Sequence, residues 1–120
     1  MIFTMLNAGR AGATDACREK GVKQIGNVRD WYPDAPDVFI ASAIADVGLG
    51  APQAVGDIIV GSFQPGSVKK IGLQNADAVR LALAPKVPKA VADEIVRLRD
   101  EIIAHRISVS TEYSGPEFAA

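Results

Sequence analysis

Short apolar runs alternate with amphipathic segments along the chain, and this alternation predicts a mixed α/β fold. Residues 2–6 are apolar and predict a strand. A turn of small residues over 7–12 follows, and residues 13–20 predict a short helix with Cys17 on its apolar face. Residues 22–26 predict a second strand. A short helix between two strands implies parallel pairing with a right-handed crossover.

The same pattern continues after a loop over residues 27–36. Residues 38–42 form a continuous apolar run, which is typical of a buried parallel strand. Apolar residues near helical spacing predict a helix over 52–63. Two further short strands are expected over residues 68–73 and 78–83.

The final helix has the clearest periodicity of the chain. Pro88 suits the first turn of a helix, where its missing N–H costs nothing. The apolar residues then repeat at a 4-3-4 spacing at Val91, Ile95, Leu98 and Ile102. We therefore expect one folded unit over residues 1–110 and a flexible polar tail over residues 111–120.

Length and composition exclude several functions. The 120 residues form at most one ordinary domain. The chain has 13 Lys and Arg and 14 Asp and Glu, so its net charge is −1. Without a basic excess, nucleic acid is not an expected partner. One cysteine and one histidine exclude a disulfide and a Cys- or His-pair metal centre, and no cofactor is expected. No nucleophile–base pair stands out, so we expect no enzymatic activity and no catalytic residue.

The turn after the first predicted strand is a candidate ligand contact. Asn7, Gly9 and Gly12 lie where exposed backbone N–H groups and a helix dipole bind anions or polar ligands. The turn matches neither the G-x-G-x-x-G fingerprint nor a P-loop. Alternatively, the small residues only allow a tight turn to pack.

Further candidates follow the next two strands. Asp30 and Trp31 come after the second strand, and open α/β sheets bind ligands at the carboxyl ends of their strands. The carboxylate could hold sugar hydroxyls and the indole could stack on a ring; alternatively, this is a solvated loop with an aromatic lid over the core. Asp46 follows the third strand at the same edge, and its favoured role is to cap the next helix.

The order of these segments resembles the basic membrane protein (BMP) family, the PnrA-like substrate-binding lipoproteins of ABC importers, over nearly the whole chain. The resemblance rests on EKGVKQIG at residues 19–26, the strand that ends in Ser42, and FQPGSVKKIGL at residues 63–73. It implies a type I periplasmic-binding-protein fold, in which two α/β lobes close on a ligand. This chain would supply the C-terminal part: an incomplete, parallel-sheet lobe with the N-terminal lobe largely missing.

The resemblance also implies a function. The protein would be the substrate-binding component of an ABC importer, which binds a small polar, nucleoside-like ligand and delivers it to a membrane permease. The family's I-G-x-D-x-D-Q pattern falls on residues 25–31, with Asp30 at the second aspartate. Val28 replaces the first aspartate, Trp31 replaces the glutamine, and Ala45 stands where the family often has lysine. These replacements remove polar contacts that the family uses.

Location and assembly follow from the same resemblance. Family members carry a signal peptide and a lipidated cysteine before this region, whereas we expect the first residues of this chain to form an apolar strand and not a signal peptide. The full-length parent is expected in the periplasm or at the cell-membrane surface. Apolar faces meant for a missing lobe would favour a homodimer. The alternative is a truncated, non-binding α/β remnant that self-associates.

Overall fold

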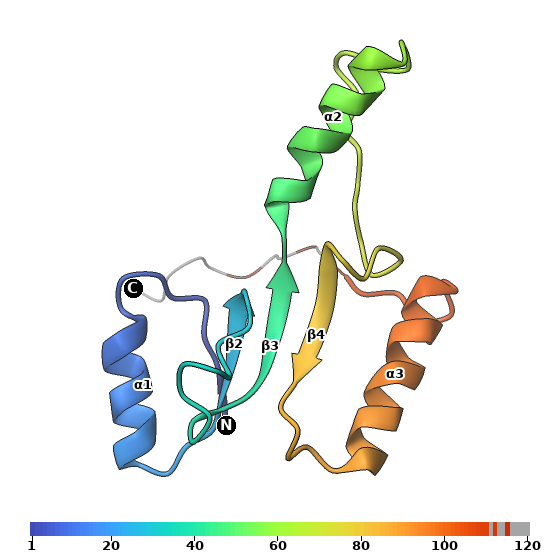
Figure 1. Cartoon of the computed structure of the whole chain (residues 1–120). Coiled ribbons are helices and arrows are strands. Elements are labelled where there is room, and N and C mark those ends of the chain that lie inside the picture. The colour runs from blue at the N-terminus through green and yellow to red at the C-terminus, as the bar shows by residue number, and fades with distance from the viewer. Residues whose placement is uncertain (111, 113–114, 116–120) are drawn as a thin grey trace.

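The computed structural model describes residues 1–110, 112 and 115 and contains one four-stranded sheet (Figure 1). The strands lie in the order in which they occur in the chain: β1 (Ile2–Phe3), β2 (Gln24–Val28), β3 (Phe39–Ala45) and β4 (Val79–Leu83). The pairs β1–β2 and β2–β3 are parallel, and β3–β4 is antiparallel. The predicted α/β class is therefore confirmed, with a sheet that is mostly rather than entirely parallel.

Three helices connect or flank these strands. α1 (Arg10–Glu19) joins β1 to β2, and α3 (Lys89–Ile103) follows β4. Figure 1 shows α1 and α3 on opposite sides of the strands. A short 3₁₀ turn, η1 (Val47–Leu49), leads from β3 into α2 (Gly50–Ile59), which projects beyond the end of β3.

The strand predicted over residues 68–73 does not form. Instead, β4 occupies the position beside β3, and Val68 is 85% exposed. Strand pairing needs a neighbour with free backbone groups, and this segment runs beside the projecting α2 rather than along the sheet. β1 is also shorter than the predicted 2–6, since the chain turns away after Thr4 donates its backbone N–H to the Ile25 carbonyl (3.1 Å).

The core lies between α1 and the strands β2 and β3. Cys17, Ala35, Val38 and Phe39 form its buried cluster, and Trp31 packs against it. Cys17 is thus a buried core residue, as its place on the apolar helix face predicts. Of the tail predicted over 111–120, all but residues 112 and 115 lie outside the described residues.

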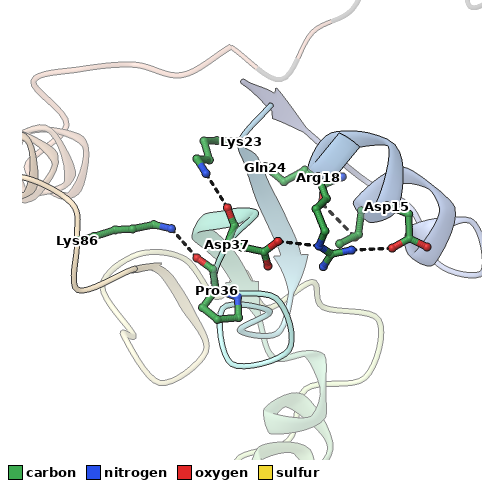
Figure 2. A network of polar contacts seen from close by, with 8 residues as sticks. Asp15, Arg18, Lys23, Gln24, Pro36, Asp37 and Lys86 are labelled. Atoms are coloured by element: carbon green, nitrogen blue, oxygen red, sulfur yellow. Dashed lines mark hydrogen bonds and ion pairs between the residues drawn. The ribbon is translucent and has the colours of Figure 1, made fainter. Parts of the chain in front are cut away.

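A polar network fastens the amino ends of β2 and β3 (Figure 2). Arg18 of α1 donates hydrogen bonds to the carboxylates of Asp15 (2.7 Å) and Asp37 (2.6 Å). Lys23 donates to the Asp37 carbonyl at 2.6 Å, and Lys86, after β4, donates to the Pro36 carbonyl. The Arg18 hydrogen bond lowers the pKa of the Asp37 carboxyl. The network thus lies at the edge of the sheet opposite to the carboxyl ends of the parallel strands.

Candidate functional site

A pocket of about 390 Å³ opens at the carboxyl ends of β2 and β3, beside the start of β4. Asp30 and Asp46 both line it. The sequence places each of them after a parallel strand, and such strands end at one edge of a sheet. The remaining lining residues are Val28, Arg29, Ile44, Ala45, Val47 and Arg80.

Asp30 is held in a tight turn that follows β2. Its Oδ1 accepts a hydrogen bond from the backbone N–H of Tyr32 (3.1 Å). The turn begins at Val28, whose φ is 73°. A β-branched residue rarely adopts this left-handed conformation, and such strain costs on the order of 1–3 kcal/mol and concentrates at functional sites. The strained residue thus stands beside the carboxylate that the sequence singles out.

Asp46 caps the helical segment after β3. Its Oδ1 accepts from the backbone N–H of Gly48 (2.9 Å), which confirms the capping prediction. A carboxylate has room for several hydrogen bonds, so one cap leaves capacity for a ligand. Arg80 adds a positive charge to the same pocket, and its Nη1 donates to the carbonyls of Ala76 (3.1 Å) and Asp77 (3.0 Å). With Arg29, the pocket is lined by two carboxylates and two guanidiniums, which suit a polar ligand with both hydrogen-bond donors and acceptors.

Trp31 lies against the sheet rather than in the pocket. Its backbone N–H donates to the buried Ser42 Oγ (3.0 Å), and its indole Nε1 donates to the Asn27 carbonyl (2.8 Å). The ring covers β2 so closely that a Cβ on Gly26 would lie 2.6 Å from Trp31 Cδ1. Its centroid is 6.3 Å from that of Phe39 in the core. Trp31 therefore forms the aromatic lid that the sequence offers as the alternative to ligand stacking.

Two arginines flank the indole. The guanidinium carbons of Arg10 and Arg29 lie 4.0 Å and 3.6 Å from the ring centroid of Trp31. Arg10 is 7% exposed and donates to the Leu6 carbonyl and to Asn27 Oδ1. Burial, and then the charge of Arg29, lower the pKa of Arg10.

The turn residues Asn7, Gly9 and Gly12 lie outside the pocket that Asp30 and Asp46 share. Asn7 is exposed, and its carbonyl accepts from the Arg10 N–H (3.2 Å). Gly9 is the residue before α1, with a φ of −76° that other residues can adopt. The helix begins at Arg10, earlier than predicted, so Gly12 is an exposed residue of its first turn.

The sequence did not single out Arg10, Asn27 or Arg80 as site residues, although all three lie at this edge. Only Arg10 carries a local signal. It is a bulky cation among small residues at a helix N-terminus, where the helix dipole disfavours positive charge.

In the described part of the chain, no three His, Cys, Asp or Glu side chains gather as metal ligands. None of the helices described there is long and apolar enough to cross a membrane.

The fold and the pocket define a class: an α/β ligand-binding unit with a polar pocket at the carboxyl edge of its parallel strands. Residues 1–112 match the family described as ABC transporter substrate-binding protein PnrA-like (Bmp). The chain belongs to this family, and the resemblance stated from its sequence is confirmed. No curated protein matches the chain. Proteins of this class bind small molecules outside the cytoplasm and present them to an ABC permease.

Proposed function

We propose that the chain takes part in binding a nucleoside-like ligand for import by an ABC transporter. The observation that supports this is the pocket in which Asp30 and Asp46 meet Arg80 at the carboxyl edge of the sheet. Carboxylates accept from adjacent ribose hydroxyls, and a guanidinium donates to ring or hydroxyl acceptors. The pocket holds no assigned nucleophile, and its role is binding without chemistry.

The other predicted residues have supporting roles in this proposal. The Arg10 amide already donates to the Asn7 carbonyl, but the amides of Ala11 and Gly12 precede the first helical hydrogen bond, from Ala13 to Gly9, and can donate to a ligand. Asn7 and Gly9 shape the approach to those amides. Trp31 supports the turn of Asp30, since its ring packs on Gly26 and lies between the two arginines. The partner is a membrane permease, and the place of action is the periplasm or the cell-membrane surface.

Calorimetric titration of a nucleoside panel into the purified chain tests the proposal. Asp30→Asn is the informative variant, because an amide oxygen still accepts from the Tyr32 N–H while the charge is lost. We expect Asp30→Asn to bind the nucleoside about tenfold or more weakly than the wild-type chain does. Asp93→Asn, on the distant and exposed α3, is the matched control. Equal affinity of wild type and Asp30→Asn would refute the role of Asp30, and a folded wild type that takes no nucleoside would refute the ligand class.

We further propose that the chain forms a homodimer through the apolar face of its projecting arm, residues 50–63. The exposed side chains of this arm are Val55, Ile58, Ile59, Val60 and Phe63. Its single charge, Asp57, is paired with Lys69 (2.7 Å), so two copies can meet without like-charge repulsion. Val55, Ile58 and Ile59 follow helical spacing and are each more than half exposed, so a second copy would remove their apolar surface from water. A second copy is therefore the occupant that fits the charge and the apolar character of this face.

A further inference from the structure

Arg10 occupies a position that electrostatics alone disfavours. Its side chain is 7% exposed, and its guanidinium lies close to a second cation, because both Arg10 and Arg29 flank the ring of Trp31. It is also the first residue of α1, at the positive end of the helix dipole. Within the described residues, Nε and Nη1 of Arg10 are buried without a hydrogen-bond partner. A buried cation in such a setting needs a specific reason to be retained.

The contacts of Arg10 supply that reason, because they join a loop to a strand of the sheet. The guanidinium donates to the carbonyl of Leu6, in the loop between β1 and α1. It also donates to the side chain of Asn27 on β2. Its planar face lies over Trp31, the residue immediately after Asp30. One side chain therefore connects the loop of Asn7 and Gly9 to the turn that holds Asp30.

Trp31 transmits this connection to the carboxylate. Its backbone N–H is fixed by Ser42 on β3, and its indole N–H by the carbonyl of Asn27. The ring cannot move toward β2, because Gly26 is already in contact with it. Asp30 is joined to Trp31 by a peptide bond, so the contacts that hold Trp31 also limit the positions open to Asp30.

We propose that Arg10 is a positioning residue that couples the loop between β1 and α1 to the Asp30 turn through Trp31. The effect of this coupling on ligand binding rests on the proposed function. The coupling itself does not. Cation–π contact and a forked set of hydrogen bonds are properties of arginine that lysine reproduces in part. Arg10→Leu thus removes the coupling, and Arg10→Lys restores a part of it.

Hydrogen exchange and fluorescence on the full chain test the coupling without any ligand. In Arg10→Leu, we expect backbone amides of both residues 4–9 and residues 27–31 to exchange about tenfold faster, with the amides of α3 unchanged. Trp31 is the single tryptophan of the chain, and acrylamide should quench its emission about twofold more strongly. Arg10→Lys should fall between Arg10→Leu and the wild type. Lys20→Leu, at an exposed position directly after the same helix, is the matched control and should leave both the exchange of residues 27–31 and the quenching of Trp31 unchanged.

The outcomes separate this proposal from the proposed function. Faster exchange confined to residues 4–9 would overturn the coupling, and so would an equal rise over the whole chain, α3 included. If the wild type binds a nucleoside, Arg10→Leu should weaken that binding about tenfold with Asp30 intact. If the wild type binds none, the ligand proposal fails, while exchange and quenching still decide the role of Arg10.

Discussion

Gly26 is the residue that allows the indole of Trp31 to pack closely against β2. A Cβ at this position would come within 2.6 Å of the indole Cδ1 and 3.1 Å of Ser42 Oγ. Both groups are held by hydrogen bonds, because the Ser42 hydroxyl accepts from the Trp31 backbone N–H and the indole N–H donates to the Asn27 carbonyl. We expect Gly26→Ala to lower the free energy of unfolding by about 1–3 kcal/mol, as overpacking of a core does. Urea denaturation followed by circular dichroism measures this change.

Gly12→Ala is the control for that experiment. Gly12 lies exposed in the first turn of α1, and a Cβ there meets no atom within 4 Å. The same substitution should therefore raise the free energy of unfolding by about 0.5–1 kcal/mol through helix propensity. Equal stability of Gly26→Ala and the wild type would contradict the close packing of Trp31 on β2.

Among the elements, those with internal periodicity follow from the sequence. α3 is predicted because its apolar stripe repeats over the helix, and β3 because its run of apolar residues is continuous. The sequence pattern does not predict the absence of a strand over 68–73 or the antiparallel direction of β4. Both depend on which strand finds a free edge beside β3, and a local pattern of apolar residues does not contain that choice.

The candidate site also has a part that the sequence predicts and a part that it does not. The meeting of Asp30 and Asp46 follows from the rule that parallel strands end at one edge, so the sequence anticipates it. The burial of Arg10 does not follow, because it depends on Asn27 and Trp31 being placed beside α1 by the sheet. Long-range contacts of this kind leave only an indirect trace, an arginine where the helix dipole disfavours one.

The network at the amino ends of the strands makes the stability of these elements depend on pH. The hydrogen bond from Arg18 lowers the pKa of Asp37 in the folded chain below its ordinary value of 3.8. The folded state therefore binds the proton less readily than the unfolded state. The stabilisation is fully present above the unfolded pKa and is lost as the pH falls through the folded pKa.

We expect the difference in stability between wild type and Asp37→Asn to be largest near neutral pH and to shrink toward about pH 3. Both side chains of the pair are about half exposed, so added salt should also reduce the difference. Urea midpoints of the two proteins at several pH values give the measurement. A difference that stays constant with pH would show that the Asp37 carboxylate does not stabilise the fold through its charge.

The molecule as a whole is more extended than a compact domain of its length. Its Cα radius of gyration is 17.5 Å, whereas a compact chain of this length has about 14 Å. Figure 1 shows the main reason: α2 stands away from the sheet. No residue of α2 is buried, although its hydrophobic positions follow helical spacing. An amphipathic helix gains its stability by burying the apolar face, so this face is the part of the molecule that most needs a partner.

Ile59→Asp places a charge at the centre of the proposed dimer face. Ile59 is 78% exposed in the single chain, so the substitution costs little in a monomer but buries an unpaired carboxylate in a dimer. We expect sedimentation analysis to show a dimer of the wild type and a monomer of Ile59→Asp with an unchanged circular dichroism spectrum. Val109→Asp, 64% exposed and outside the arm, should remain dimeric. A wild type that stays monomeric at high micromolar concentration would refute self-association, and the apolar arm would then be the surface on which a different partner is to be sought.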